Sequence, residues 1–267
     1  MSSGLVPGVL ALGMLLQVAP SAYADDPNDY INPDRPGLAD GSYVIGGGRF
    51  QIETGLEQEY RSDAGSREQD VFIATLLRLG LDRHWEVRVE GNTYTWMRTK
   101  DSQGVTRSDG ASPTSLGVKY HFIDSAEALR PSVGAILRVF PPSGTGNFRT
   151  AHTTGDLRLV ADWDFASEWS LNPNIGAAFG EDNAGRVYRA GLFAMTLNYN
   201  PSKILNLFID TGMQSPEQKF GKTSIIFDAG VAYIIGRNIQ VDLSVGSGAT
   251  GVTPPRPFVA AGISKRF

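Results

Sequence analysis

The stretch Phe50-Gln51-Ile52-Glu53-Thr54-Gly55-Leu56-Glu57-Gln58-Glu59-Tyr60-Arg61 places its apolar and aromatic side chains on one parity. The other parity is polar, and four of its six positions are charged: Glu53, Glu57, Glu59 and Arg61. A helix, with a period of about 3.6 residues, would not separate residues in this way. A strand with one face toward hydrocarbon and the other toward water must do so. The stretch therefore favours a strand of a membrane barrel.

The same alternation recurs along the chain. We count about twelve such runs, an even number as in single-chain bacterial barrels. They lie near residues 49–62, 69–81, 84–97, 113–123, 130–140, 153–165, 168–180, 187–199, 203–213, 223–235, 237–247 and 256–267. The sequence thus predicts an all-β fold, a closed antiparallel transmembrane β-barrel of about twelve strands over residues 49–267, with ten or fourteen strands as alternatives.

The connections between the runs alternate in length. Those at 81–83, 166–167 and 236–237 are tight, whereas those at 99–112, 141–151 and 215–222 are long and polar. Short turns are typical of the periplasmic side and long loops of the outer side. The final run ends on Phe267. We expect this run to pair with the first strand, and Phe267 to be read by the barrel-assembly machinery as a partner.

The start of the chain predicts export. The apolar run over residues 4–19 is followed by Ser21-Ala22-Tyr23-Ala24 and then by Asp25, which is typical of a cleaved signal peptide over 1–24. The chain has 0 cysteines, which excludes a lipid-modified cysteine and a disulfide framework. No later stretch reaches the roughly 18 apolar residues of a membrane helix. We therefore expect the bacterial outer membrane as the location and its lipid as a partner.

Composition agrees with a barrel but also fits a soluble β-sandwich. Charged residues make up 19% of the chain and there are 31 glycines, fewer charges and more glycine than ordinary soluble domains contain. A net charge of −4 without a basic block predicts no nucleic-acid partner. The sandwich and the barrel differ in whether the purified protein needs detergent.

Residues 25–48 show no sustained period and indicate an extended periplasmic segment or a small plug. The sequence Asn32-Pro33-Asp34-Arg35-Pro36, with residues 39–43 and 47–53 after it, resembles the opening of the outer-membrane β-barrel transporter family named for a phenol-degradation meta-pathway (MetA-type). Residues 76–81, 85–88 and 117–120 agree with this pattern, and Lys265 departs from it where an aromatic residue is common. The resemblance implies a barrel for passage of small compounds, with aromatic ones as candidates.

The parity of the runs also predicts which charges face the interior. The inward set is Glu53, Glu57, Glu59, Arg61, Arg78, Glu86, Arg88, Glu90, Lys119, His121, Arg138, Asp156, Arg158, Asp162, Asp164, Arg189, Asp210, Asp228 and Asp242. From it we select Arg78, Arg88, Asp210, Asp228 and Asp242 as lumen-lining residues. Acidic and basic walls would orient a dipolar solute. Alternatively, the charges pair across strands and fill a narrow lumen.

We predict an outer-membrane channel for passive passage of small solutes, with aromatic or hydrophobic compounds as candidates. The alternatives are a barrel enzyme of the lipase or protease type and a non-conducting structural barrel. An enzyme would need a nucleophile beside a histidine base. The histidines His84, His121 and His152 are scattered along the chain. The sequence therefore predicts no catalytic residue, no metal site and no cofactor.

Overall fold

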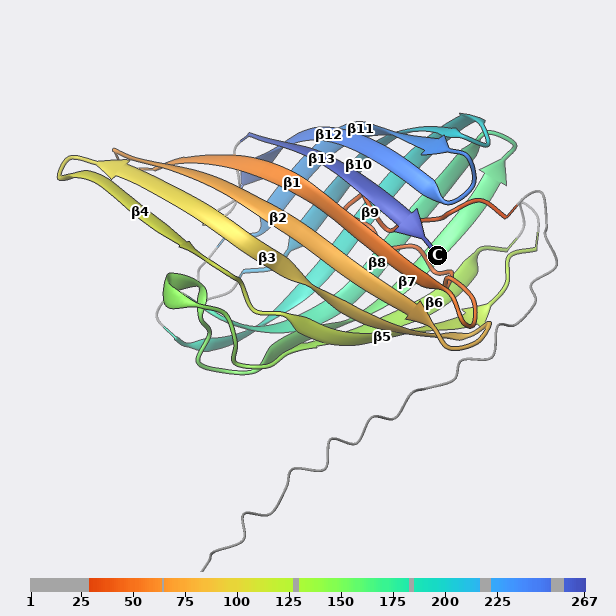
Figure 1. The fold of residues 1–267 in the computed structure, drawn as a ribbon, viewed down its shortest axis with the longest axis horizontal. Helices are drawn as coiled ribbons and strands as arrows, with labels where there is room; N and C mark the ends of the chain where they lie inside the picture. Colours follow the sequence, from red (N-terminus) through yellow and green to blue (C-terminus); the bar gives the residue numbers. More distant parts are fainter. Residues whose placement is uncertain (1–28, 64, 127–129, 183–184, 217–221, 251–256) are drawn as a thin grey trace, which may run out of the picture.

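The computed structural model describes residues 29–63, 65–126, 130–182, 185–216, 222–250 and 257–267. The predicted signal peptide lies outside these residues. Figure 1 shows strands that tilt around a common interior. The strands are β1 (Phe50–Asp63), β2 (Ser66–Gly80), β3 (Trp85–Asp101), β4 (Gly104–Gly110), β5 (Ser115–Ile123), β6 (Ser132–Phe140), β7 (Thr154–Ala166), β8 (Trp169–Glu181), β9 (Val187–Ser202), β10 (Leu205–Gln214), β11 (Ser224–Ile235), β12 (Ile239–Thr250) and β13 (Phe258–Arg266), with a short 3-10 helix, Gly146–Phe148, between β6 and β7.

The sheet closes on itself. Neighbouring strands pair antiparallel, β1 pairs with both β2 and β13, and the pairing of β2 with β3 completes the ring. At the seam the Phe267 N–H donates to the Phe50 carbonyl at 2.8 Å. Closure leaves no strand edge exposed to lipid, where an unpaired backbone group would be costly. The predicted closed antiparallel barrel is confirmed.

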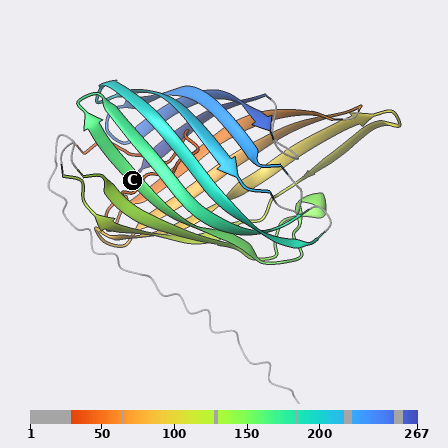
Figure 2. The same ribbon diagram turned by 180° about the vertical axis from the view of Figure 1, so that it is seen from behind.

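The barrel has 12 strands because β4 and β5 share one position in the ring. β5 pairs with β3 over Trp85–Glu90, and β4 pairs with β3 further along, over Thr95–Asp101. The prediction of a loop at 99–112 was wrong over most of its length, because β3 and β4 form a hairpin there. This hairpin extends beyond the barrel in Figures 1 and 2. Outside the hydrocarbon region both faces of a strand can be polar. The alternation of apolar and polar residues therefore ends before the strands end.

The sheet carries apolar side chains on its exposed outer face and charged side chains on its buried inner face, the reverse of a soluble protein. Outward leucines are half exposed, as at Leu157 (55%) and Leu116 (61%), whereas Arg78 and Lys119 inside are at most 1% exposed. Aromatic pairs lie outside at the short-turn end, where the rings of Trp169 and Tyr199 are 4.8 Å apart. An apolar belt with aromatic rims is the outer surface of a membrane barrel. In the described part of the chain, no helix is long and apolar enough to cross a membrane.

The predicted inward orientation of Arg189 was wrong. Arg189 is exposed and lies opposite Phe179, which is itself exposed on the outer face, while the neighbouring Ala190 is buried inside. The strand begins here with Val187-Tyr188-Arg189-Ala190, in which neither parity is clearly apolar. At this long-loop end the outer face meets water, so an outward charge costs little.

Candidate functional site

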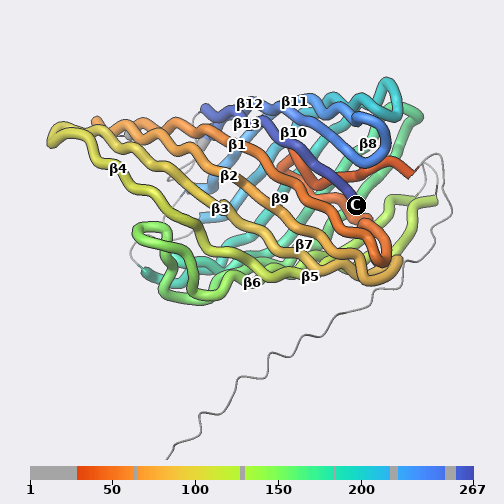
Figure 3. Tube along the Cα trace, viewed as in Figure 1, coloured from red at the N-terminus to blue at the C-terminus, as the bar shows by residue number. Residues whose placement is uncertain are grey.

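Residues 29–48, which we call the N-terminal segment, run through the barrel interior without forming a strand. Figure 3 shows this stretch, red to orange, within the ring of strands. Six of its backbone N–H groups donate to inward side chains of the strands. The pairs are Asp34 and Arg35 to Glu53 Oε2 (2.9 and 3.0 Å), Leu38 to Asp210 Oδ2 (2.8 Å), Asp40 to Asn174 Oδ1 (2.8 Å), Ser42 to Asp162 Oδ2 (2.6 Å) and Ile45 to Glu86 Oε2 (3.0 Å). Buried polar side chains thus satisfy a buried, irregular backbone.

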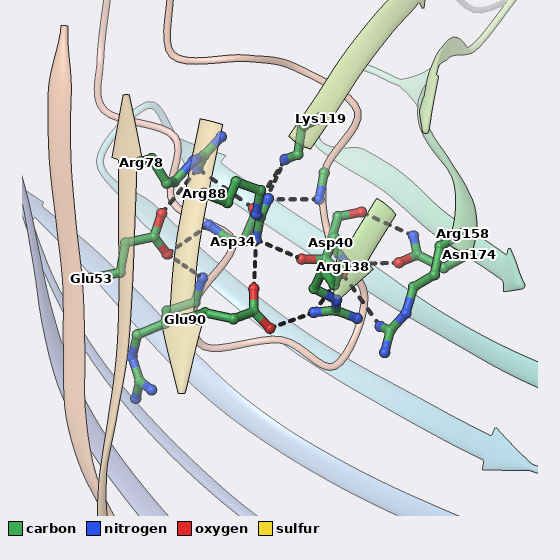
Figure 4. Close-up of polar contacts among 12 residues, drawn as sticks. Asp34, Asp40, Glu53, Arg78, Arg88, Glu90, Lys119, Arg138, Arg158 and Asn174 are labelled. Atoms are coloured by element: carbon green, nitrogen blue, oxygen red, sulfur yellow. Dashed lines mark hydrogen bonds and ion pairs between the residues drawn. The ribbon is translucent and has the colours of Figure 1, made fainter. Parts of the chain in front are cut away.

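Asp34 is the centre of a buried charge cluster, shown in Figure 4. Its Oδ2 lies 2.6 Å from Arg88 Nη1, 3.0 Å from Lys119 Nζ and 3.6 Å from Arg78 Nη1. The three cations come from β3, β5 and β2. Arg78 also donates to Glu53 (2.9 Å) and Glu86 (2.7 Å). One acid of the N-terminal segment therefore neutralises cations from three strands.

Asp40, six residues further along the N-terminal segment, has the same role. Its carboxylate accepts from Arg88 Nη2 at 3.1 Å and from Arg158 Nη1 at 3.3 Å. Arg138 lies 4.0 Å away and is held mainly by Asp156 and Glu90. The basic wall formed by β2, β3, β5, β6 and β7 is thus compensated partly by strand acids and partly by the N-terminal segment.

Both segment acids are ionised in this environment. Burial alone would raise the pKa of Asp34, but Arg78, Lys119 and Arg88 hold that pKa well below its usual range. For Asp40, burial is again the largest opposing effect, and Arg138 and Arg88 lower the pKa overall. Neighbouring positive charge favours the carboxylate form. The N-terminal segment is therefore held by charge–charge contacts in a buried setting.

The opposite wall is acidic. Asp210 on β10 and Asp228 on β11 face each other in register, and Asp242 on β12 pairs with Arg35 of the N-terminal segment at 3.1 Å. The Arg35 side chain lies over Gly55 and Gly262, where a Cβ would approach it to 2.5 Å. Within the described residues, Oδ1 of Asp210 and of Asp228 and Oδ2 of Asp242 are buried without a hydrogen-bond donor. Each of the three carboxylates on this wall therefore has one oxygen that could accept a further hydrogen bond.

Two cavities of about 320 Å³ each lie on either side of the N-terminal segment. The short-turn cavity is polar, and its wall carries hydrogen-bonded amides from three strands: Asn206 donates to Asn198 (3.0 Å) and Asn200 (2.9 Å), and Asn198 donates to Asn172. The long-loop cavity is more apolar and is lined by Leu38, Leu192, Ala194 and Ile226, with Arg158 and Asn174 as polar members of its lining. The N-terminal segment contributes to both linings, so it separates them.

The five residues selected from sequence lie on two opposed walls. Arg78 and Arg88, each 1% exposed, are engaged with acids, and Asp210, Asp228 and Asp242 are 6–7% exposed. Sequence reasoning gave no role to Asp34, Arg35 and Asp40, which connect the walls, or to the amide cluster. The signal for Asp34 and Arg35 was present in the acid-Arg-Pro stretch at residues 34–36, and Asp40 belongs to the stretch 39–43 that follows it. An aperiodic stretch has no parity, so its side chains could not be assigned to a wall.

In the described residues, the three histidines contact backbone carbonyls and acids. His121 is buried, with Nδ1 3.1 Å from the Ser42 carbonyl and Nε2 2.9 Å from Asp124. The His84 ring lies 3.1 Å from the His121 carbonyl. Among the residues that the structure describes, no three His, Cys, Asp or Glu side chains are placed to hold a metal ion.

Solved structures with the same fold are outer-membrane barrels. An outer membrane channel from Pseudomonas putida F1 is 11% identical, with a TM-score of 0.68, over 89% of this chain and 100% of that one. The KdgM porin is 10% identical, with a TM-score of 0.51, over 81% and 99% of the two chains. The transport unit of the autotransporter AIDA-I from Escherichia coli is 11% identical, with a TM-score of 0.52, over 89% and 93%.

Sequence comparison gives two further results. The model of the family described as "Putative MetA-pathway of phenol degradation" matches residues 33–267. None of the curated proteins matches the chain in sequence. The resemblance seen in the opening residues is therefore confirmed over most of the chain.

Proposed function

Because the chain belongs to the family described as "Putative MetA-pathway of phenol degradation", we propose that it is an outer-membrane channel through which small solutes diffuse. The observation that carries this proposal is the pair of cavities inside a closed barrel, one toward each end. Solvent-filled space on both sides of a narrow interior segment is what a gated or restricted passage requires. A purely structural barrel would have no need of such space.

We propose a division of the chain into a removed leader over 1–24, a plug over 25–48 and a barrel over 49–267. Contacts from Asp34, Arg35 and Asp40 to opposite walls support the plug. In this arrangement Arg78 and Arg88 anchor the plug on the basic side. Asp210, Asp228 and Asp242 line the passage on the acidic side.

The long-loop cavity suggests the class of solute. Its apolar side chains from the N-terminal segment, β9 and β11 are suited to a ring or a short hydrocarbon chain. Arg158 in its lining is 22% exposed and keeps part of its guanidinium accessible. An apolar body with one carboxylate or hydroxyl, such as an aromatic acid, matches this combination. Solutes pass unchanged in this proposal, with no catalytic residue involved.

Flux into liposomes tests the proposal. Purified protein in liposomes should admit benzoate and the neutral sugar arabinose faster than protein-free liposomes do, and Arg158→Gln should slow benzoate several-fold while leaving arabinose unchanged. The matched control is Arg186→Gln, an exposed arginine that pairs with Asp182 near the loops. Flux equal to that of empty liposomes would refute a channel, and hydrolysis of ester or peptide substrates by the same preparation would favour the enzyme alternative.

We also propose that the assembly machinery recognises β13. Its terminal Phe267 packs against Phe50 with ring centroids 6.0 Å apart, and the Lys265 ammonium lies 4.6 Å from the Phe267 ring centroid. Lys265 thus accompanies the terminal ring rather than replacing it. Phe267→Ala should reduce the amount of folded barrel in the outer membrane more than Lys265→Ala does, measured by the heat-dependent shift of the folded form on gels.

A further inference from the structure

The hairpin of β3 and β4 carries a set of cations on its outer face. Tyr94 and Trp96 on β3 are exposed on that face, with ring centroids 4.8 Å apart. The next two outward positions along β3 are Arg98 and Lys100, both exposed. The outer face of β3 therefore changes from lipid-facing to basic immediately beyond the aromatic pair of Tyr94 and Trp96.

Two neighbouring strands add to this charge. Arg67 on β2 lies directly opposite Lys100, and Arg107 on β4 lies directly opposite Arg98. Residues opposite each other in an antiparallel pair share a face, with Cβ atoms about 5 Å apart. Positions two residues apart on one strand are about 7 Å apart. We call Arg67, Arg98, Lys100 and Arg107 the basic patch.

One acid shares the face of the basic patch, and it is engaged with an aromatic residue. Within the described part of the chain, none of the members of the basic patch makes an ion pair. Asp109, the acid on the same face of β4, instead accepts a hydrogen bond from the Tyr94 hydroxyl. Like charges directly opposite each other destabilise a sheet. The acids on the strands do not neutralise this repulsion, whereas a bound external anion would.

We propose that the basic patch binds the phosphate groups of a lipid headgroup in the outer leaflet. Val71 and Ile73 lie opposite Trp96 and Tyr94, so the patch continues the lipid-facing wall and does not face the passage. Tyr and Trp mark the membrane interface, and one step of two residues beyond them reaches the headgroup level. Guanidinium groups match phosphate with paired hydrogen bonds. This inference requires the barrel to sit in the outer membrane, and it is independent of solute passage.

Native mass spectrometry of the detergent-solubilised barrel measures this binding. The probes are lipid A with both phosphates and the same lipid with its phosphates removed. Wild type should retain the phosphorylated lipid better. The double variant Arg98→Gln/Arg107→Gln should bind the phosphorylated lipid about thirtyfold more weakly, as expected from loss of two interfacial cations. The control Arg83→Gln/Arg130→Gln removes two exposed cations at the opposite end of the barrel and should bind as wild type does.

Three outcomes would overturn the proposal. Equal retention of the two lipids by wild type would show that phosphate is not recognised. Equal losses in both double variants would show a general charge effect. Displacement of the phosphorylated lipid by millimolar inorganic phosphate would identify a soluble anion as the ligand. The heat-dependent gel shift checks that each variant is folded, and the comparison of the two lipids on wild type decides the question even if a variant does not fold.

Discussion

Replacing Asp34 with asparagine should release the N-terminal segment from the barrel wall. The carboxylate of Asp34 contacts Arg88 at 2.6 Å, Lys119 at 3.0 Å and Arg78 at 3.6 Å. Arg78 and Arg88 keep strand acids or Asp40 as partners when this charge is lost. Lys119 is 0% exposed, and its other hydrogen bond is a 3.4 Å contact with the Tyr43 carbonyl. The substitution therefore leaves a buried ammonium with no carboxylate within 4 Å among the described residues while the segment is docked, and Glu86, opposite Lys119 on β3, stays as a more distant acid.

The size of the effect follows from that unpaired charge. Removing one partner of a buried ion pair costs about 3–5 kcal/mol. The cost applies only while the N-terminal segment is docked, because an undocked segment leaves Lys119 open to water. Docking should therefore weaken by at least about 3 kcal/mol, a shift of roughly a hundredfold in the equilibrium.

Thiol labelling measures this equilibrium directly. The chain has 0 cysteines, so Ala39→Cys places a single thiol on the N-terminal segment at a position that is 7% exposed. In liposomes, the rate of reaction with a water-soluble maleimide should rise about a hundredfold when Asp34→Asn is added. Single-channel recordings on the same variants should show more frequent open events.

The matched control is Asp156→Asn. Asp156 is a buried acid that pairs with Arg138 and Arg158 on the wall and makes no bond to the N-terminal segment. This variant should lose barrel stability without faster labelling of the thiol. Labelling of the Asp34→Asn chain at the wild-type rate would refute the reasoning, because the charge cluster would then not hold the segment.

Three further results are expected. Since the pKa values of Asp34 and Asp40 are lowered on docking, their contribution is complete above an undocked pKa of about 4 and is lost as pH falls through the lower docked values. The labelling rate, divided at each pH by the rate of a freely exposed thiol to remove the pH dependence of the thiolate itself, should therefore be flat from about pH 5 to 8 and rise only below about pH 4. Gly80→Ala places a Cβ 1.8 Å from the Gly46 carbonyl oxygen and should lower the melting temperature in detergent by several degrees; an unchanged midpoint would contradict this contact. Leu192→Asn makes the long-loop cavity polar and should slow benzoate flux more than acetate flux in the liposome assay.

The barrel could be predicted from sequence because its physical requirement is local. Each strand in lipid must alternate, and Phe50–Arg61 shows this without reference to any other strand. The β3–β4 hairpin was missed because Arg98, Lys100 and Thr106 lie beyond the hydrocarbon, where no rule demands apolar residues. Parity likewise separated Arg78 from Leu77 and Asp242 from Val241. It failed at Arg189, where both parities are mixed.

The centre of the site depended on contacts that no period encodes. Asp34 and Lys119 are 85 positions apart, and Arg35 and Asp242 are 207 apart. The sequence contains the complementary charges, but only a closed barrel brings them together. The placement of the N-terminal segment therefore needed the structure, although the residues that hold it were already conspicuous as the opening motif.

The attachment of the N-terminal segment to the last strands sets an order of events during biogenesis. The Ile31 N–H donates to the Arg237 carbonyl at 2.7 Å, and Asp29 lies 2.9 Å from the Arg266 guanidinium. Although residues 29–48 leave the ribosome before any strand, these anchors do not exist until the C-terminal end has been made and inserted. The contacts of Asp34 with β2, β3 and β5 become possible earlier, so the first residues of the segment are fixed after its middle, although they are synthesised before it.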